Sequence, residues 1–241
     1  MAGFPVGLIA LVVVSGLIYL GLAHRLLDRL YLSDRAALAV IAAMVIGSFI
    51  DVPVVAGPVR VSLNVGGALI PLGLAVYILV RAGTAREWGR ALLATAVTVA
   101  VLTSLNLFVL SPDPWQTGRD FLDPLYVYPL VGGTVAYLAG RSRRAAFIAG
   151  TLGVLALDGV DYFRLTRAGI PGVVAVGGAG LFDAVVVSGL LAVLLAEVVG
   201  EVRERLQGGP AHRGRPEELL KNLGPLPVKK ELPGGEDRDE V

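Results

Sequence analysis

Apolar residues fall in seven long blocks along the chain, and charged residues collect in the short stretches between them. A helix needs about 20 mainly apolar residues to cross the hydrocarbon core of a bilayer, and several blocks approach that length. The pattern predicts an all-α fold, a polytopic membrane helical bundle with seven spans. The expected spans are residues 3–23, 36–51, 65–81, 91–110, 124–140, 145–162 and 179–199.

The two ends of the chain differ in character. The apolar run that ends near Ala23 is too long for the core of a signal peptide, so we interpret it as a retained span. Residues 201–241 are rich in glycine, proline and charge and cannot bury enough apolar surface to fold alone. We expect a seven-span domain over residues 1–200 and a polar, disordered tail over residues 201–241, with docking of a protein partner as a second role for the tail.

The composition agrees with a bilayer environment, since 55% of the residues are hydrophobic and 17% are charged. Soluble domains have about 45–50% hydrophobic and 25% charged residues. A net charge of +1 provides no basic surface for nucleic acid. The chain has no cysteine and two histidines, His24 and His212, both in polar stretches. The absence of cysteine excludes disulfides and Cys-ligated metals, and the positions of the histidines argue against a histidine site within the membrane. No cofactor is therefore predicted apart from a possible cation.

The distribution of arginine predicts the orientation of the spans. The loops after the first, third and fifth spans, together with Arg81 at the end of the third span, hold nine arginines, whereas those after the second, fourth and sixth hold four. Because cytoplasmic loops are enriched in basic residues, the arginine-rich loops should be cytoplasmic. The N-terminus is then outside and the tail inside, and the expected location is the cytoplasmic membrane of a prokaryote.

Two stretches of the chain resemble each other. Asp51 is followed by Gly-Pro and then Val59–Ala68, and Asp161 is followed by Pro-Gly and then Gly172–Ala179. Both stretches end in Val-Gly-Gly-Ala. A 3-1-3 parallel repeat, with span four as the linker, would place both stretches outside, and such repeats occur in transporters. Chance similarity is the alternative, because valine and glycine are common in this chain.

Four aspartates within or beside the expected spans are candidates for chemistry, because a charged group inside a membrane is costly. Asp158 and Asp161 lie near the end of span six and share a helix face. Asp183 lies near the start of span seven, and Asp51 lies at the end of span two. All four are expected toward the outer surface, where a short connection makes spans six and seven neighbours.

Two amides and three glycines complete the candidate site. Asn106 lies in the outer half of span four, and Asn64 precedes the third span, so both could bind an ion or a solute together with the aspartates. Glycines permit close approach of backbones, and the packing glycines beside span seven are Gly177, Gly178 and Gly180.

A structural role is the alternative for each aspartate. Asp51 can mark the end of a helix, and Asp161 can pair with Arg164 in the headgroup region. Asp158 and Asp183 can cap or hydrogen-bond backbone groups.

Four segments are similar to a known family: Gly47–Pro53, Gly150–Gly153, Val176–Asp183 and Ser188–Ala196. The family consists of multi-pass membrane proteins from bacteria and archaea and is known as a domain of unknown function. The resemblance would cover most of residues 1–200. It implies a membrane location and no established activity.

The region around Asp183 also resembles, more locally, the presenilin-type and signal-peptide-peptidase-type intramembrane proteases. These carry one Asp on one helix and Gly-x-Gly-Asp on the next. The resemblance implies Asp183 as the second aspartate and Asp158 or Asp161 as the first, with Gly180 at the first glycine position. The departures are that Phe182 replaces the second glycine, that no Pro-Ala-Leu motif follows, and that seven spans are expected rather than nine.

Three functions remain open from the sequence. The first is binding or transport of a small solute, cation or proton at an outward-facing acidic site. The second is an intramembrane aspartyl protease, in which Asp183 and either Asp158 or Asp161 share one proton and activate water. The third is a structural or assembly protein of the membrane that uses its tail for contacts.

Overall fold

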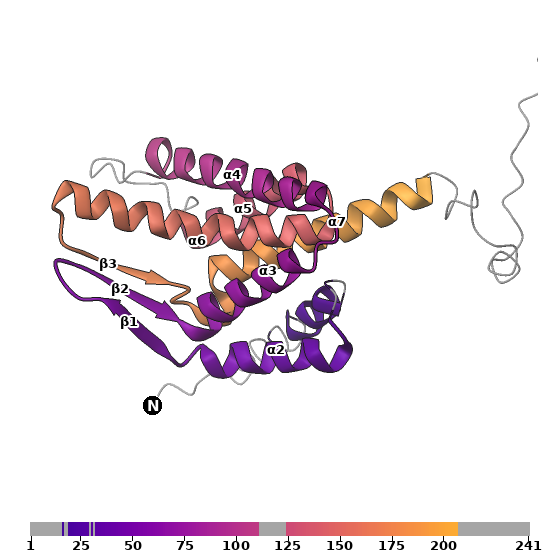
Figure 1. Ribbon diagram of the computed structural model, residues 1–241, viewed down its shortest axis with the longest axis horizontal. Helices are drawn as coiled ribbons and strands as arrows, with labels where there is room; N and C mark the ends of the chain where they lie inside the picture. Colours follow the sequence, from indigo (N-terminus) through magenta and orange to yellow (C-terminus); the bar gives the residue numbers. More distant parts are fainter. Residues whose placement is uncertain (1–15, 17–18, 29, 31, 111–123, 207–241) are drawn as a thin grey trace, which may run out of the picture. The chain divides into compact units, whose positions relative to one another are not determined.

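The computed structural model describes residues 16, 19–28, 30, 32–110 and 124–206 (Figure 1). Two compact units are distinguished, residues 1–198 and 199–241, and the described part of the second is the end of helix α7. Residues 19–28 are helical. The elements that follow are α2 (Asp34–Gly47), β1 (Asp51–Val55), β2 (Val59–Asn64), the π-helical turn η1 (Val65–Leu69), α3 (Ile70–Val80), α4 (Ala85–Phe108), α5 (Pro124–Gly140), α6 (Arg143–Ala168), β3 (Gly172–Val176), the 3-10 turn η3 (Gly180–Phe182) and α7 (Ala184–Leu206).

Three of the described helices are long and apolar enough to cross a membrane: Ala85–Phe108, Arg143–Ala168 and Ala184–Arg203. They correspond to the fourth, sixth and seventh expected spans. Val65–Val80 is a shorter apolar helix, and α2 has 14 residues, which is about 21 Å of helix. The seven-span count and the orientation therefore stay predictions. Most of the first expected span lies outside the described residues, as does the tail beyond residue 206.

Three strands correct the all-α expectation. β1 and β2 form an antiparallel hairpin, and β3 joins the free edge of β2 in parallel, which gives the order β1-β2-β3. The strands are short valine-rich runs bounded by Gly-Pro and Pro-Gly. β2 and β3 lie between the expected spans and were read as connections, although β-branched residues favour strands. Pro53 is accommodated because β1 is an edge strand.

The two similar stretches of sequence lie side by side as β2 and β3. The register places Val59 opposite Gly172 and Leu63 opposite Val176. Each strand leads through a short irregular turn into an apolar helix, β2 through η1 into α3 and β3 through η3 into α7. The sequence similarity thus corresponds to two packed strand-to-helix junctions, while the wider 3-1-3 repeat stays a prediction.

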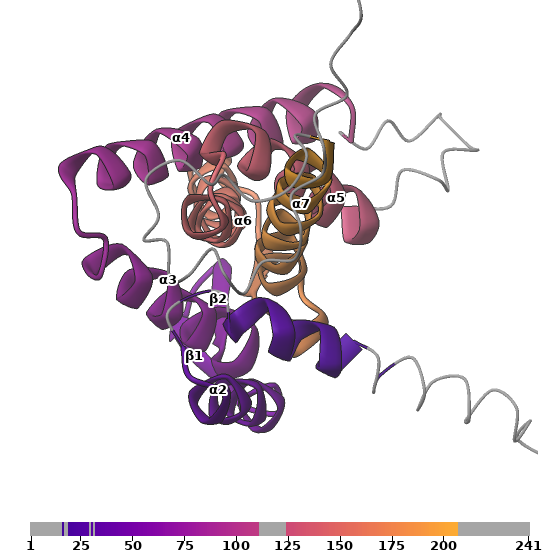
Figure 2. The same cartoon turned by 90° about the vertical axis from the view of Figure 1, so that its right-hand side faces the viewer.

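Small residues bring the long helices together. Figure 2 shows α6 nearly end-on, with α4 on one side and α7 on another. A Cβ atom on Gly153 would lie 3.0 Å from Thr98 Cβ on α4, and one on Gly150 would lie 2.9 Å from the carbonyl oxygen of Ser188 on α7. Such glycines allow close helix approach, which is the usual basis of helix association in membranes.

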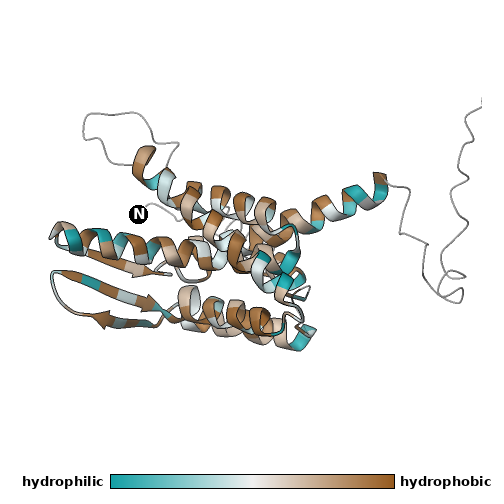
Figure 3. Ribbon diagram, turned by 45° about the horizontal axis from the view of Figure 1, so that its top comes forward, coloured by the Kyte–Doolittle hydropathy of each residue, from teal (hydrophilic) through white to brown (hydrophobic). Residues whose placement is uncertain are grey.

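Apolar residues make up most of each helix, as the colouring in Figure 3 shows, and many of them are exposed. Ile46 on α2, Leu93 on α4 and Leu130 on α5 are 66%, 67% and 62% exposed. A soluble monomer rarely exposes extended apolar surface. These helix faces therefore suit contact with lipid.

The sheet covers the C-terminal half of α6. Val59 on β2 and Val174 and Val176 on β3 are buried, and Leu155 and Tyr162 of α6 pack against them. Val52 and Val54 on the edge strand β1 and Val173 on β3 are exposed. One wall of the candidate site is thus a strand that the hydropathy pattern did not predict.

Candidate functional site

A cleft of about 490 Å³ lies where the end of α4, the C-terminal half of α6 and strand β3 meet. Its polar lining consists of Asn106, Asp158, Asp161 and Arg164. The remaining walls are formed by Leu165, Ala168, Ile170, Val173, Val174 and Ala175. Three of the residues that the sequence singled out therefore face one space. The contribution of β3 was missed, because residues 172–176 were read as a connection between spans.

The end of α6 determines the shape of the cleft. Gly169 adopts a left-handed conformation (φ 65°), and its N–H donates to the Thr166 carbonyl while that of Ile170 donates to the Leu165 carbonyl. This is a Schellman motif, which glycine favours because it has no Cβ atom. Pro171 cannot continue the helix. The chain therefore turns back as β3 and faces the side of α6 that carries the aspartates.

Asp161 is fully engaged within the cleft. The Asn106 side-chain amide donates to both carboxylate oxygens of Asp161, at 2.9 and 3.1 Å. Arg164, one helical turn further along α6, pairs with Asp161 Oδ1 at 3.3 Å. The ion pair with Arg164, which is the alternative structural role of Asp161, is thus present. The hydrogen bonds from Asn106 also link α4 to α6.

Asp158 has no such partner. Its half-buried side chain makes no hydrogen bond or ion pair with any residue that the structure describes. It lies within electrostatic range of two other carboxylates, those of Asp183 and Asp161. Repulsion between like charges in a partly desolvated setting favours a bound proton or a cation.

Asp183 lies immediately before α7, the first 20 residues of which are apolar enough to cross a membrane. Its Oδ1 accepts a hydrogen bond from the Val185 amide at 2.9 Å, and its Oδ2 accepts one from the Ala179 amide at 3.1 Å. Burial raises the pKa of Asp183, and the two backbone hydrogen bonds act in the opposite direction. Asp183 therefore caps α7 and adds negative charge near Asp158. A catalytic role for it stays a prediction.

Asp51 and Asn64 form a separate cluster on β1 and β2. The Asn64 amide donates to the Ser48 carbonyl oxygen at 2.9 Å and to Asp51 Oδ1 at 3.0 Å. Its Oδ1 accepts from the Gly67 amide at 2.8 Å. Asn64 is 1% exposed, so these bonds fix the end of α2, the hairpin and η1 to one another. Neither residue lines the cleft.

The packing glycines lie where the two strand-to-helix junctions touch. Gly177 and Gly180 have positive φ angles of 69° and 61°, and a Cβ on Gly67 would meet the carbonyl oxygen of Gly180 at 2.7 Å. Gly178 is less crowded, since a Cβ there would lie 3.0 Å from Ala175 Cβ. Ser48, which the sequence did not single out, accepts a hydrogen bond from the Leu181 amide at 3.0 Å and so links α2 to η3.

A known protein family matches most of the chain. No curated protein and no solved structure is similar to this chain. Residues 27–195 match the family described as "Protein of unknown function (DUF1614)". The match covers more than half of the chain and includes all four aspartates and both amides discussed above. The chain therefore belongs to the DUF1614 family.

Proposed function

We propose that the protein binds a small cation in the acidic cleft, as the binding step of transport across the cytoplasmic membrane of a prokaryote. The observation that carries the proposal is Asp158, whose carboxylate lines the cleft without a compensating partner among the described residues. Arg164 neutralises Asp161. The uncompensated charge of Asp158, reinforced by Asp183, is then available to a ligand.

The chemistry of the lining favours a small cation over an anion or a large apolar ligand. The cleft presents two carboxylates, one amide and one guanidinium that is already paired. Carboxylate and amide oxygens are ligands for hard cations such as Na⁺ and Ca²⁺, and carboxylates also pair with organic ammonium groups. Its apolar side walls, such as Val173 and Ile170, suit a small alkylammonium ion as well as a bare one.

The two strand-to-helix junctions support transport rather than binding alone. α3 and α7 each begin after a strand, and their first turns, η1 and η3, touch each other. Helices that begin near a binding site are typical of secondary transporters, where parts of the protein rock around a fixed site, and Asp183, just before α7, lies within electrostatic range of Asp158 in the cleft. The neighbouring glycines Gly67 and Gly177 pack backbone against backbone, as such a junction requires.

The arginines support an outward-facing cleft. Arg141, Arg143 and Arg144 line a second cleft of about 330 Å³ at the opposite end of α6. Asp158 lies 15 residues after Arg143, about 22 Å along the helix. With the basic end on the cytoplasmic side, the acidic cleft opens toward the outside.

The second candidate is the intramembrane aspartyl protease. The electrostatic proximity of Asp158 and Asp183 favours it, because paired carboxylates can share one proton. Both oxygens of Asp183 accept backbone hydrogen bonds, however, which leaves Asp183 poorly suited as a general base. We therefore rank cation binding first. A role of the tail in protein contacts concerns residues outside the described part of the chain.

A thermal-shift experiment tests the proposal. Detergent-purified protein is heated with NaCl, KCl, MgCl₂, CaCl₂ or choline chloride at matched ionic strength, and with a hydroxyl-isostere aspartyl-protease inhibitor. A ligand at one hundred times its Kd stabilises the native state by about 2.7 kcal/mol, which raises Tm by several degrees. We expect a shift with at least one cation in the wild type and none in Asp158→Asn.

The matched control is Asp51→Asn, which removes a carboxylate outside the cleft and should retain the shift. The cation identified in this way is then tested for uptake into proteoliposomes. Equal shifts in wild type and Asp158→Asn would refute the proposed site, and a shift with the inhibitor alone would favour the protease.

A further inference from the structure

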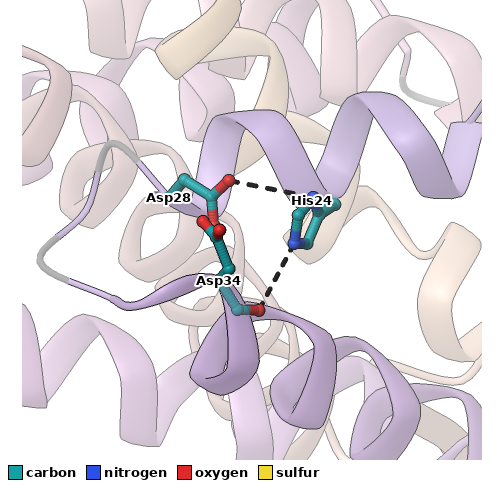
Figure 4. Close-up of side chains that lie close together, drawn as sticks. All are labelled: His24, Asp28 and Asp34. Carbon is teal, nitrogen blue, oxygen red and sulfur yellow. Dashed lines mark hydrogen bonds and ion pairs between the residues drawn. The ribbon is translucent and has the colours of Figure 1, made fainter.

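A second group of polar side chains lies far from the cleft in the sequence, where the helical segment 19–28 meets α2. His24 and Asp28 are four residues apart and share one face of their helix. Asp34 is the first residue of α2. Figure 4 shows the three side chains converging, with His24 between Asp28 and the backbone of Asp34. The apolar core holds both helices in place through Ala23, Leu27 and Ile41.

The spacing of the three side chains is close to that of metal ligands. One ligand atom from each residue lies within 4.8 Å of the others, and His24 Nδ1 is 3.7 Å from Asp28 Oδ2. Ligands bound to zinc at about 2.0–2.1 Å in a tetrahedral site are about 3.4 Å apart. The His24–Asp28 pair is thus almost at the required separation. Asp34 is exposed, and one of its carboxylate oxygens lies within 4.8 Å of the other two ligand atoms.

The hydrogen bonding of His24 prepares its other nitrogen for a metal. Nε2 lies 3.3 Å from the backbone carbonyl oxygen of Asp34, which can only accept a hydrogen bond. A proton on Nε2 leaves the lone pair of Nδ1 directed toward Asp28 Oδ2, another acceptor. Metal-binding histidines commonly donate their second N–H to a carbonyl in this way, which fixes the tautomer and the ring orientation.

An independent observation comes from the other oxygen of Asp28. Asp28 Oδ1 is shielded from solvent and has no hydrogen-bond partner among the described residues. The carboxylates of Asp28 and Asp34 point toward each other in Figure 4. A carboxylate oxygen that is buried without a partner is costly, and a facing carboxylate increases that cost. A cation between the two carboxylates removes both penalties.

We propose that His24, Asp28 and Asp34 bind one divalent transition-metal ion, with Zn²⁺ as the best fit. Imidazole together with carboxylate ligands suits Zn²⁺ and its first-row neighbours better than Ca²⁺ or Mg²⁺, which prefer oxygen alone. Three protein ligands leave a coordination position for water. The ion joins the helical segment 19–28 to the start of α2. This site is separate from the acidic cleft and does not depend on the proposed transport function.

Isothermal titration of the full chain with ZnCl₂, in detergent and with a purification tag that contains no histidine, tests the proposal. The chain offers a matched control, because it has two histidines and no cysteine. We expect one Zn²⁺ per chain, at least tenfold weaker binding in His24→Gln and Asp34→Asn, and unchanged binding in His212→Gln. The visible absorption of bound Co²⁺ reports the coordination geometry, and circular dichroism checks that each variant is folded.

Several results would overturn the site. These are the absence of stoichiometric Zn²⁺ binding by the wild type, binding that His24→Gln leaves unchanged, and binding that His212→Gln abolishes. Asp158→Asn should leave Zn²⁺ affinity as it is, so a failure of the cleft proposal and a failure of the metal site give different results.

Discussion

Replacement of Asn64 by alanine should destabilise the protein strongly, because this buried side chain connects three parts of the fold. The substitution removes hydrogen bonds of 2.8, 2.9 and 3.0 Å to Gly67, Ser48 and Asp51. The hydrogen bonds to Ser48 and Asp51 contribute about 1 kcal/mol net each, and the Gly67 amide, left buried without a partner, costs about 1–3 kcal/mol. We expect a loss of about 3–5 kcal/mol, a large share of the roughly 5–15 kcal/mol by which typical proteins are stable.

The variant Asn64→Asp separates the donor and acceptor roles of this side chain. A carboxylate can still accept from the Gly67 amide, but it has no N–H for Ser48 and would face Asp51 as a like charge. We expect Asn64→Asp to be less stable than Asn64→Ala at pH 7. Lowering the pH should restore part of the lost stability, since a protonated carboxyl group can donate a hydrogen bond. A double-mutant cycle with Asp51→Ala isolates the contribution of that pair.

Unfolding in detergent micelles with increasing denaturant, followed by circular dichroism, measures these differences. A loss below about 1 kcal/mol in Asn64→Ala would refute the structural interpretation. If such a stable variant also lost cation binding, Asn64 would be a ligand, as the sequence alone suggested.

Two further predictions concern α6 and α7. Gly150→Ala should destabilise the protein by about 1–3 kcal/mol, since its Cβ would press on the Ser188 backbone. The control Gly159→Ala, on the same helix but with open space around it, should be neutral or stabilising by up to about 1 kcal/mol. Equal Tm values for both variants would contradict the close α6–α7 contact. Burial raises the pKa of Asp183, so the stability that comes from its protonation is present at acid pH and is lost as the pH rises through the raised pKa. The Tm of the wild type relative to Asp183→Asn should therefore fall from acid to neutral pH. A Tm difference that does not change with pH would contradict this prediction.

The sequence predicted the parts of the fold that depend on local hydropathy and spacing. The three long helices follow from apolar blocks of sufficient length, and the pairing of Asp161 with Arg164 follows from their separation by one helical turn. The strands were missed because Val59–Asn64 and Gly172–Val176 lie between expected spans and were read as connections. The alternation of apolar and polar residues in Val59–Asn64 is a strand signal that could have identified β2, whereas Gly172–Val176 is apolar throughout and shows no alternation.

The side-chain contacts that the sequence did not predict join separate elements of the fold. Asn64 binds Ser48 and Asp51 because the hairpin folds back on the end of α2, whereas the sequence grouped it with the acidic cluster. His24 meets Asp34 across the turn between two helices. Neither contact leaves a signal in hydropathy, since both depend on how separate elements pack.

The parallel pairing of β2 with β3 has a consequence for biogenesis. The paired residues Val59 and Gly172 are more than a hundred positions apart in the chain. At translation rates of about 5–20 residues per second, β2 is synthesised roughly 6–20 s before β3. During that interval the hairpin presents an open edge, which can pair with another chain. The sheet is complete, and this edge is covered, only after β3 has been synthesised.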